Sequence, residues 1–183
     1  TLAFDGGCVK KSIILVGPLL TRSGYGEQAR FALRALRSRP DLFEVFIKPI
    51  TWGQTSWIVD DTPERRWIDE TIEKTIGYLQ QGGQFDMSLQ ITIPNEFNRE
   101  VAKTNIGYTA GIETTQPAPI WIQKCNEMDS VIVVSNHSKN VLENTKFEGT
   151  DENTGQKIIL ENQSKITSVN YPTKSYDELP ELN

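Results

Sequence analysis

Short apolar runs alternate with amphipathic segments along this chain, and the alternation predicts buried strands followed by helices. Apolar runs rich in β-branched residues are typical of strands buried on both faces of a sheet. Segments with apolar residues three and four positions apart are typical of helices that pack on such a sheet. The predicted strands cover residues 12–17, 43–48, 86–92, 106–111 and 131–134.

A helix is predicted behind the first strand, from Gly24 to about Pro40, because the apolar spacing changes there from strand to helix periodicity. The predicted buried face carries Ala29, Ala32, Leu33 and Leu36, and the opposite face carries Arg30, Arg34 and Arg37.

Further helices are predicted behind the other strands. One begins at Pro63 with Thr62 as its N-cap and ends at Gly82 and Gly83. Others cover 96–103 after the cap Asn95, a segment opened by Pro119, and 136–144. The expected buried stripe of the second helix is Ile68, Ile72, Ile76 and Leu79, and that of the helix after Pro119 is Trp121, Cys125 and Met128.

Strand and helix alternate throughout residues 1–170, which predicts one α/β domain with a parallel sheet and helices on both faces. Right-handed crossovers favour a Rossmann-like, doubly wound arrangement. Residues 148–155 are polar and are predicted to be mobile. Residues 157–160 and 165–169 are expected either to pair as a hairpin or to form two edge strands.

Composition and charge exclude several classes of protein. A net charge of -5 and a pI near 5.0 lack the basic footprint of nucleic-acid binders. No apolar run reaches the length of about 18 residues that a membrane span needs. His137 is the single histidine, so no site with two imidazoles exists and neither a metal nor another cofactor is expected. Cys8 and Cys125 provide no CxxC pair or disulfide framework, so we expect a reducing, cytoplasmic location.

The unusual residues follow the predicted strands, at the edge of the sheet where α/β proteins bind ligands. Gly24, Tyr25 and Gly26 open the first helix and match G-x-G-x-x-A with Ala29. Six residues separate Gly24 from the strand, and no carboxylate follows the second strand, so an NAD site is disfavoured. The glycines either expose backbone N–H groups to an anionic or hydroxyl-bearing ligand, or simply allow a tight loop.

Three more strand ends carry candidate chemistry. Glu113 could act as a base or accept hydrogen bonds from sugar hydroxyls, or it could cap a turn or pair with Arg22. Trp52 and Trp57 follow the second strand and could stack on a sugar ring or anchor the packing of their loop. His137 lies beside serines, but no G-x-S-x-G elbow precedes it, so nucleophilic hydrolysis is disfavoured.

Three stretches of sequence resemble the N-terminal domain of GT-B-fold glycosyltransferases of the group 1 (family 4) class. They are IILVGPLLTRSGYGEQARFALRAL, GYTAGIETTQPAPIWIQKCNEMDSVIVVSNHSK and ITSVNYPTKSYDELP, and the likeness spans most of residues 12–180. The resemblance implies an acceptor-binding domain that faces a C-terminal, donor-binding domain across a cleft, with residues 171–183 starting the linker between them. It also implies transfer of a sugar from a nucleoside diphosphate sugar, as co-substrate, to a glycan or small-molecule acceptor.

By position, the resemblance assigns Gly24, Tyr25 and Gly26 to the donor phosphates or the reacting sugar. Thr114 and Glu113 would line the acceptor side, and Ser135 with Asn136 would border the cleft. The chain departs from the family pattern at Gly111-Ile112-Glu113, where many relatives place a histidine. Glu113 is the catalytic candidate of this chain. A retaining reaction without a metal is implied, with little activity from this domain alone. The alternative is a free-standing Rossmann-like module that binds a small polyol or nucleotide without catalysis.

Overall fold

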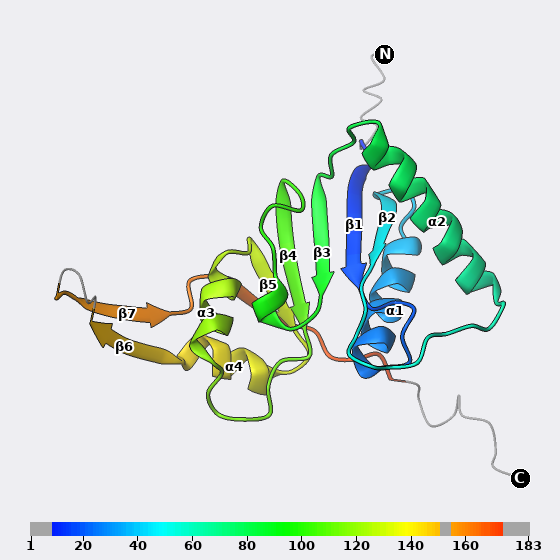
Figure 1. The fold of residues 1–183 in the computed structure, drawn as a ribbon. Helices are drawn as coiled ribbons and strands as arrows, with labels where there is room; N and C mark the ends of the chain where they lie inside the picture. Colours follow the sequence, from blue (N-terminus) through cyan, green and yellow to red (C-terminus); the bar gives the residue numbers. More distant parts are fainter. Residues whose placement is uncertain (1–8, 151–154, 174–183) are drawn as a thin grey trace, which may run out of the picture.

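The computed structural model describes residues 9–150 and 155–173, which form an α/β domain (Figure 1). A six-stranded parallel sheet has the order β2-β1-β3-β4-β5-β8, and β6 and β7 form a separate antiparallel pair. The strands are β1 (Lys11–Gly17), β2 (Phe43–Pro49), β3 (Met87–Ile91), β4 (Thr104–Thr109), β5 (Ser130–Val133), β6 (Lys146–Thr150), β7 (Lys157–Glu161) and β8 (Lys165–Ser168). The helices are α1 (Gly24–Arg37), α2 (Pro63–Gln80), α3 (Pro119–Asn126) and α4 (Asn136–Asn144), with the 3-10 turn η1 (Pro94–Glu96).

The strand order confirms the predicted doubly wound architecture. The chain moves outward from β1 to β2 and then returns past β1 to form β3, so the direction of winding reverses between β1 and β3. In open α/β sheets such a reversal leaves a crevice at the carboxyl ends of the two strands. The helix α1 begins directly after β1, beside this point.

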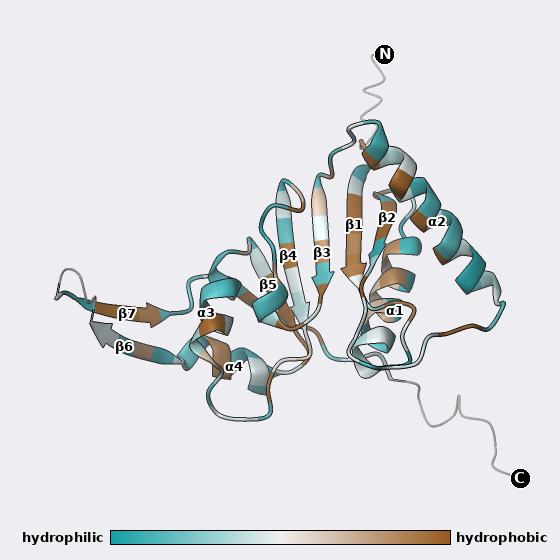
Figure 2. Cartoon of the chain, viewed as in Figure 1, coloured by the Kyte–Doolittle hydropathy of each residue, from teal (hydrophilic) through white to brown (hydrophobic). Residues whose placement is uncertain are grey.

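Alternation along the strands divides the apolar core between the two faces of the sheet. Ile13 and Leu15 of β1 pack with Leu33 of α1, whereas Ile14 packs with Phe46 on the other face. Figure 2 shows that the residues of β1, which other strands flank on both sides, are predominantly apolar. Full burial of each such side chain stabilises the fold by roughly 1.5–3 kcal/mol.

Cap side chains fix where three helices begin. The hydroxyl of Ser23 accepts from the N–H of Gly26 at 3.0 Å, and Thr62 accepts from Arg65 at 3.1 Å. Ser135 accepts from the N–H of Ser138 in the same way. Each such cap contributes about 1 kcal/mol. The caps place the starts of α1 and α4 at the carboxyl edge of the sheet.

The predicted helix over 96–103 is wrong, because buried side chains hold this segment in another conformation. Only η1 forms at its start. The N–H of Asn98 donates to Gln90, and the side chain of Asn105 donates to the carbonyls of Arg99 and Ala102. These bonds satisfy backbone groups that a helix would have paired internally.

The predicted stripe of α2 is wrong at Ile76 and Leu79, which are 52% and 49% exposed, while Thr71 and Thr75 are buried. The helix lies along the edge strand β2, and the hydroxyl of Thr75 accepts from the N–H of Ile47 at 3.0 Å. Thr75 is therefore buried although it is polar, because its hydroxyl pairs with a backbone N–H group on the open edge of β2.

The C-terminal strands pair differently from the predicted hairpin. β7 pairs with β6, and β8 joins the main sheet beside β5 as an edge strand, where Ile166 is buried. Part of the segment predicted to be mobile, up to Thr150, belongs to β6. Residues 151–154, Cys8 and most of the predicted linker, 174–183, lie outside the described residues.

Candidate functional site

The start of α1 is the centre of the candidate site. Ser23 caps the N–H of Gly26, and the N–H of Glu27 donates to the carbonyl of Ser23 at 3.0 Å. Within the described part of the chain, the N–H groups of Gly24 and Tyr25 have no hydrogen-bond partner. Free N–H groups at a helix N-terminus attract anions because the helix dipole adds partial positive charge there.

A cavity of about 400 Å³ opens beside these N–H groups. Arg22 and Asp60 form an exposed ion pair of 3.0 Å at this cavity. Its lining is Arg22, Ser23, Gly24, Glu27, Arg30, Ile58 and Asp60. The cavity thus combines a helix N-terminus with two ion pairs, Arg22–Asp60 and Arg30–Glu27, so the free N–H groups are the feature suited to an anionic ligand.

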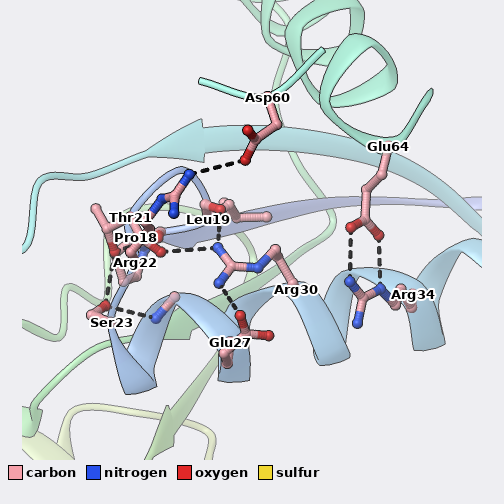
Figure 3. A network of polar contacts seen from close by, with 11 residues as sticks. Pro18, Leu19, Thr21, Arg22, Ser23, Glu27, Arg30, Arg34, Asp60 and Glu64 are labelled. Carbon is pink, nitrogen blue, oxygen red and sulfur yellow. Dashed lines mark hydrogen bonds and ion pairs between the residues drawn. The ribbon is translucent and has the colours of Figure 1, made fainter. Parts of the chain in front are cut away.

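Arg30 holds the loop between β1 and α1 in place. Figure 3 shows its guanidinium between the carbonyls of Leu19 and Thr21, at 2.6 and 3.0 Å, and the carboxylate of Glu27 at 2.6 Å. Arg30 is 4% exposed, so its predicted place on the polar outer face is wrong. The charge of Arg30 is buried because two carbonyl oxygens and a carboxylate compensate it.

The two glycines of the α1 motif have different surroundings. A Cβ added to Gly26 would lie 2.2 Å from the carbonyl oxygen of Thr21, whereas a Cβ added to Gly24 would meet nothing within 4 Å. Gly26 therefore allows the loop to pack against the helix, which supports the tight-loop interpretation for this residue. Gly24 lines the cavity, and its backbone is accessible to a ligand there.

Tyr25 connects three loops at the carboxyl edge. Its hydroxyl is 2.8 Å from the hydroxyl of Thr109 at the end of β4, and it accepts from the N–H of Ala110 at 3.2 Å. Its ring lies 4.3 Å from that of Trp52 in the loop after β2. Burial raises the pKa of the Tyr25 phenol, so the group is a neutral hydrogen-bonding residue.

The end of β4 also packs against the start of α4. Gly111 has φ +86°, and an added Cβ would collide with the side chain of Ser138. The hydroxyls of Ser138 and Ser135 are 3.0 Å apart. Ser135 is thus used as a helix cap near the β4 loop, and Asn136 beside it is exposed.

Glu113 and Thr114 lie on the exposed loop after β4. Thr114 donates to the carbonyl of Gln116 at 3.0 Å. The interpretation that Glu113 pairs with Arg22 is wrong, because Arg22 pairs with Asp60. An exposed carboxylate of this kind is accessible to a ligand.

The two tryptophans after β2 differ in role. Trp52 is half-buried against Tyr25, as expected for a packing anchor. Trp57 is 44% exposed, and its backbone bridges Thr21. Trp57 therefore keeps an aromatic surface available for stacking near the α1 cavity.

Sequence reasoning missed the residues that join these loops. Thr109, Ser138 and the buried Arg30 lie in ordinary strand or helix positions, with no local signal of their contacts. The sequence held one indication of the role of Arg30, which is a charged residue one helical turn after the glycines that open α1.

Comparison of this chain with known proteins assigns no function to the site. No family model, no curated protein and no solved structure matches this chain. Among residues 9–150 and 155–173, no group of three or more His, Cys, Asp or Glu side chains could hold a metal ion. In the same ranges, every helix is too short or too polar to cross a bilayer.

Proposed function

We propose that this chain is the acceptor-side domain of a GT-B-fold glycosyltransferase, and that the start of α1 binds the diphosphate of a nucleoside diphosphate sugar. The observation that carries the proposal is the pair of free N–H groups, of Gly24 and Tyr25, beside a cavity lined by Arg22 and Arg30. The sequence resemblance assigns the donor phosphates to the same helix start.

The chemistry of transfer suits this position. When the sugar leaves its donor, negative charge builds on the departing diphosphate. Fixed N–H dipoles and cations placed around that charge lower the barrier because they need no reorganisation. Arg22 can release Asp60 at little cost, since exposed ion pairs are worth only about 0–1 kcal/mol, and can then turn to a phosphate.

The acceptor side of the proposed cleft consists of the loops after β4 and β5. Glu113 would act on the acceptor hydroxyl, with Thr114, Ser135 and Asn136 as hydrogen-bonding neighbours. Trp57 would offer a stacking surface to a sugar ring. A donor-binding domain, a glycan or small-molecule acceptor and closure of the cleft between the domains complete the proposal.

Binding of inorganic diphosphate to this chain tests the anion site. We expect titration calorimetry to detect binding that Gly24→Val abolishes, because the side chain would fill the cavity above the free N–H groups. Gly77→Val is the matched control, since an added Cβ at Gly77 on α2 also meets nothing within 4 Å. Equal binding by the Gly24→Val variant would remove this helix start from the site.

A binding-only module would use the same cavity without chemistry. The discriminating measurement is release of nucleoside diphosphate from a panel of nucleotide sugars, made on the product of the longest open reading frame that contains this chain. Diphosphate released only when an acceptor is present supports the transferase. Binding of nucleotide or polyol without release supports the module.

A further inference from the structure

The β6–β7 hairpin projects from the main sheet, beyond α3 and α4 (Figure 1). It packs against the domain through Phe147 and Leu160, which contact the apolar cluster under these helices. Farther out, Ile158 and Ile159 are 50% and 60% exposed, and Figure 2 shows β7 as an apolar strand. A two-stranded ribbon is marginally stable in water, and it gains from additional strands.

One edge of β7 is unpaired from Lys157 to Leu160, and at the end of the strand the carbonyl of Glu161 accepts from the side chain of Asn126 on α3 at 2.9 Å. β6 pairs along its other edge, and no further strand of the described chain pairs with it. An open edge presents unpaired N–H and C=O groups to any strand of suitable sequence. Charges or prolines in the middle of a strand normally prevent such pairing, but β7 has its charges only at Lys157 and Glu161, its two ends.

The geometry points to a homodimer in which β7 pairs antiparallel with β7 of a second copy, around a two-fold axis at Ile159. The sequence Lys157-Ile158-Ile159-Leu160-Glu161 is complementary to itself when reversed. Lys157 lies opposite Glu161 of the second copy, and Ile158 lies opposite its Leu160. Because the axis repeats each contact, the interface contains two pairs of opposite charges.

On one face of the hairpin, a row of charged residues would continue across the two-fold axis into the second copy. Lys146 and Glu161 are cross-strand partners joined by a 2.6 Å ion pair. The next residue in that row is Lys157 of the second copy, so charges alternate in sign along the row. Because of this charge complementarity, a second copy of the chain is the partner that best fits the unpaired edge of β7.

The opposite face of the hairpin gains an apolar row. Phe147 lies across from Leu160, and Ile158 of the second copy continues the row. On the single chain, Ile158 lies across from Gly149, which covers none of its side chain. Antiparallel pairing also puts Lys157 of one β7 beside Glu161 of the other, so the two main sheets lie at opposite ends of the four-stranded ribbon.

Sedimentation velocity over a concentration series tests the dimer. We expect a species of about twice the 20.7 kDa chain mass. Lys157→Glu and Glu161→Lys should each weaken dimerisation by about tenfold or more, because each turns two attractive pairs into repulsive ones. An equimolar mixture of the two variants should dimerise again, since each chain then offers the charges that the other lacks. Lys48→Glu, on the exposed side of β2, is the charge-matched control.

Recovery in the mixture separates a lost interface from a lost fold, because unfolded chains would not recover. A wild-type chain that stays monomeric across the series overturns the proposal. A dimer that both single variants leave unchanged, or that the mixture does not restore, also overturns it.

Discussion

Replacing Gly26 by alanine is expected to destabilise the domain strongly. The added Cβ would lie 2.2 Å from the carbonyl oxygen of Thr21, where ordinary contacts are 3.4–4 Å, so the loop after β1 must move by about 1 Å. Overpacking of this kind costs about 1–3 kcal/mol. The movement also strains the Ser23 cap on Gly26, which is worth about 1 kcal/mol.

The expected total is about 2–4 kcal/mol, a large part of the roughly 5–15 kcal/mol by which domains are stable. Urea unfolding followed by tryptophan fluorescence should show the midpoint of Gly26→Ala lowered by about 1–2 M. Gly24→Ala is the control, because its Cβ meets nothing within 4 Å and its stability should equal or exceed that of the wild type. Equal midpoints for Gly26→Ala and the wild type would refute the packing argument.

Three further outcomes are expected. Hydrogen bonds from Ser12, together with Lys103, lower the pKa of Asp86 to about 2. The ionised Asp86 therefore stabilises the fold above about pH 4, and this contribution is lost as the pH falls toward 2. In acid titrations Asp86→Asn should lose less stability than the wild type over that window, and parallel losses would contradict this. Burial raises the pKa of Cys125 to about 12, so in a Cys8→Ser background a thiol reagent near pH 8 should react only on unfolding. Tyr25→Phe should lower the free energy of unfolding by about 0.5–1.5 kcal/mol in urea titrations, because the bond to Thr109 is lost, and an unchanged value would argue against that bond.

Much of the fold could be predicted because its signals are local. The strands β1, β2 and β5 are rich in apolar residues, and the cap residues Ser23, Thr62 and Ser135 stand immediately before their helices. The polar strand β6 carries no such signal. The segment 96–103 was missed because the groups that hold it belong to Gln90 and Asn105, on either side of it in the sequence.

The candidate site was predictable only in part. Its edge of the sheet follows from the parallel alternation, since the carboxyl ends of parallel strands lie together. The difference between Gly24 and Gly26 could not be predicted, because both stand in one glycine motif and only the course of the loop over Gly26 separates them.

The sequence by itself determined an α/β domain, the order of most of its elements and the edge on which its polar loops gather, because these depend on periodicity and on caps a few residues away. Tertiary structure alone decided that Tyr25 reaches Thr109, 84 residues later, and that Arg30 is buried under the first loop. It also decided that, among the described strands, only β6 pairs with β7. Such contacts depend on how distant segments pack, and no local pattern records that packing.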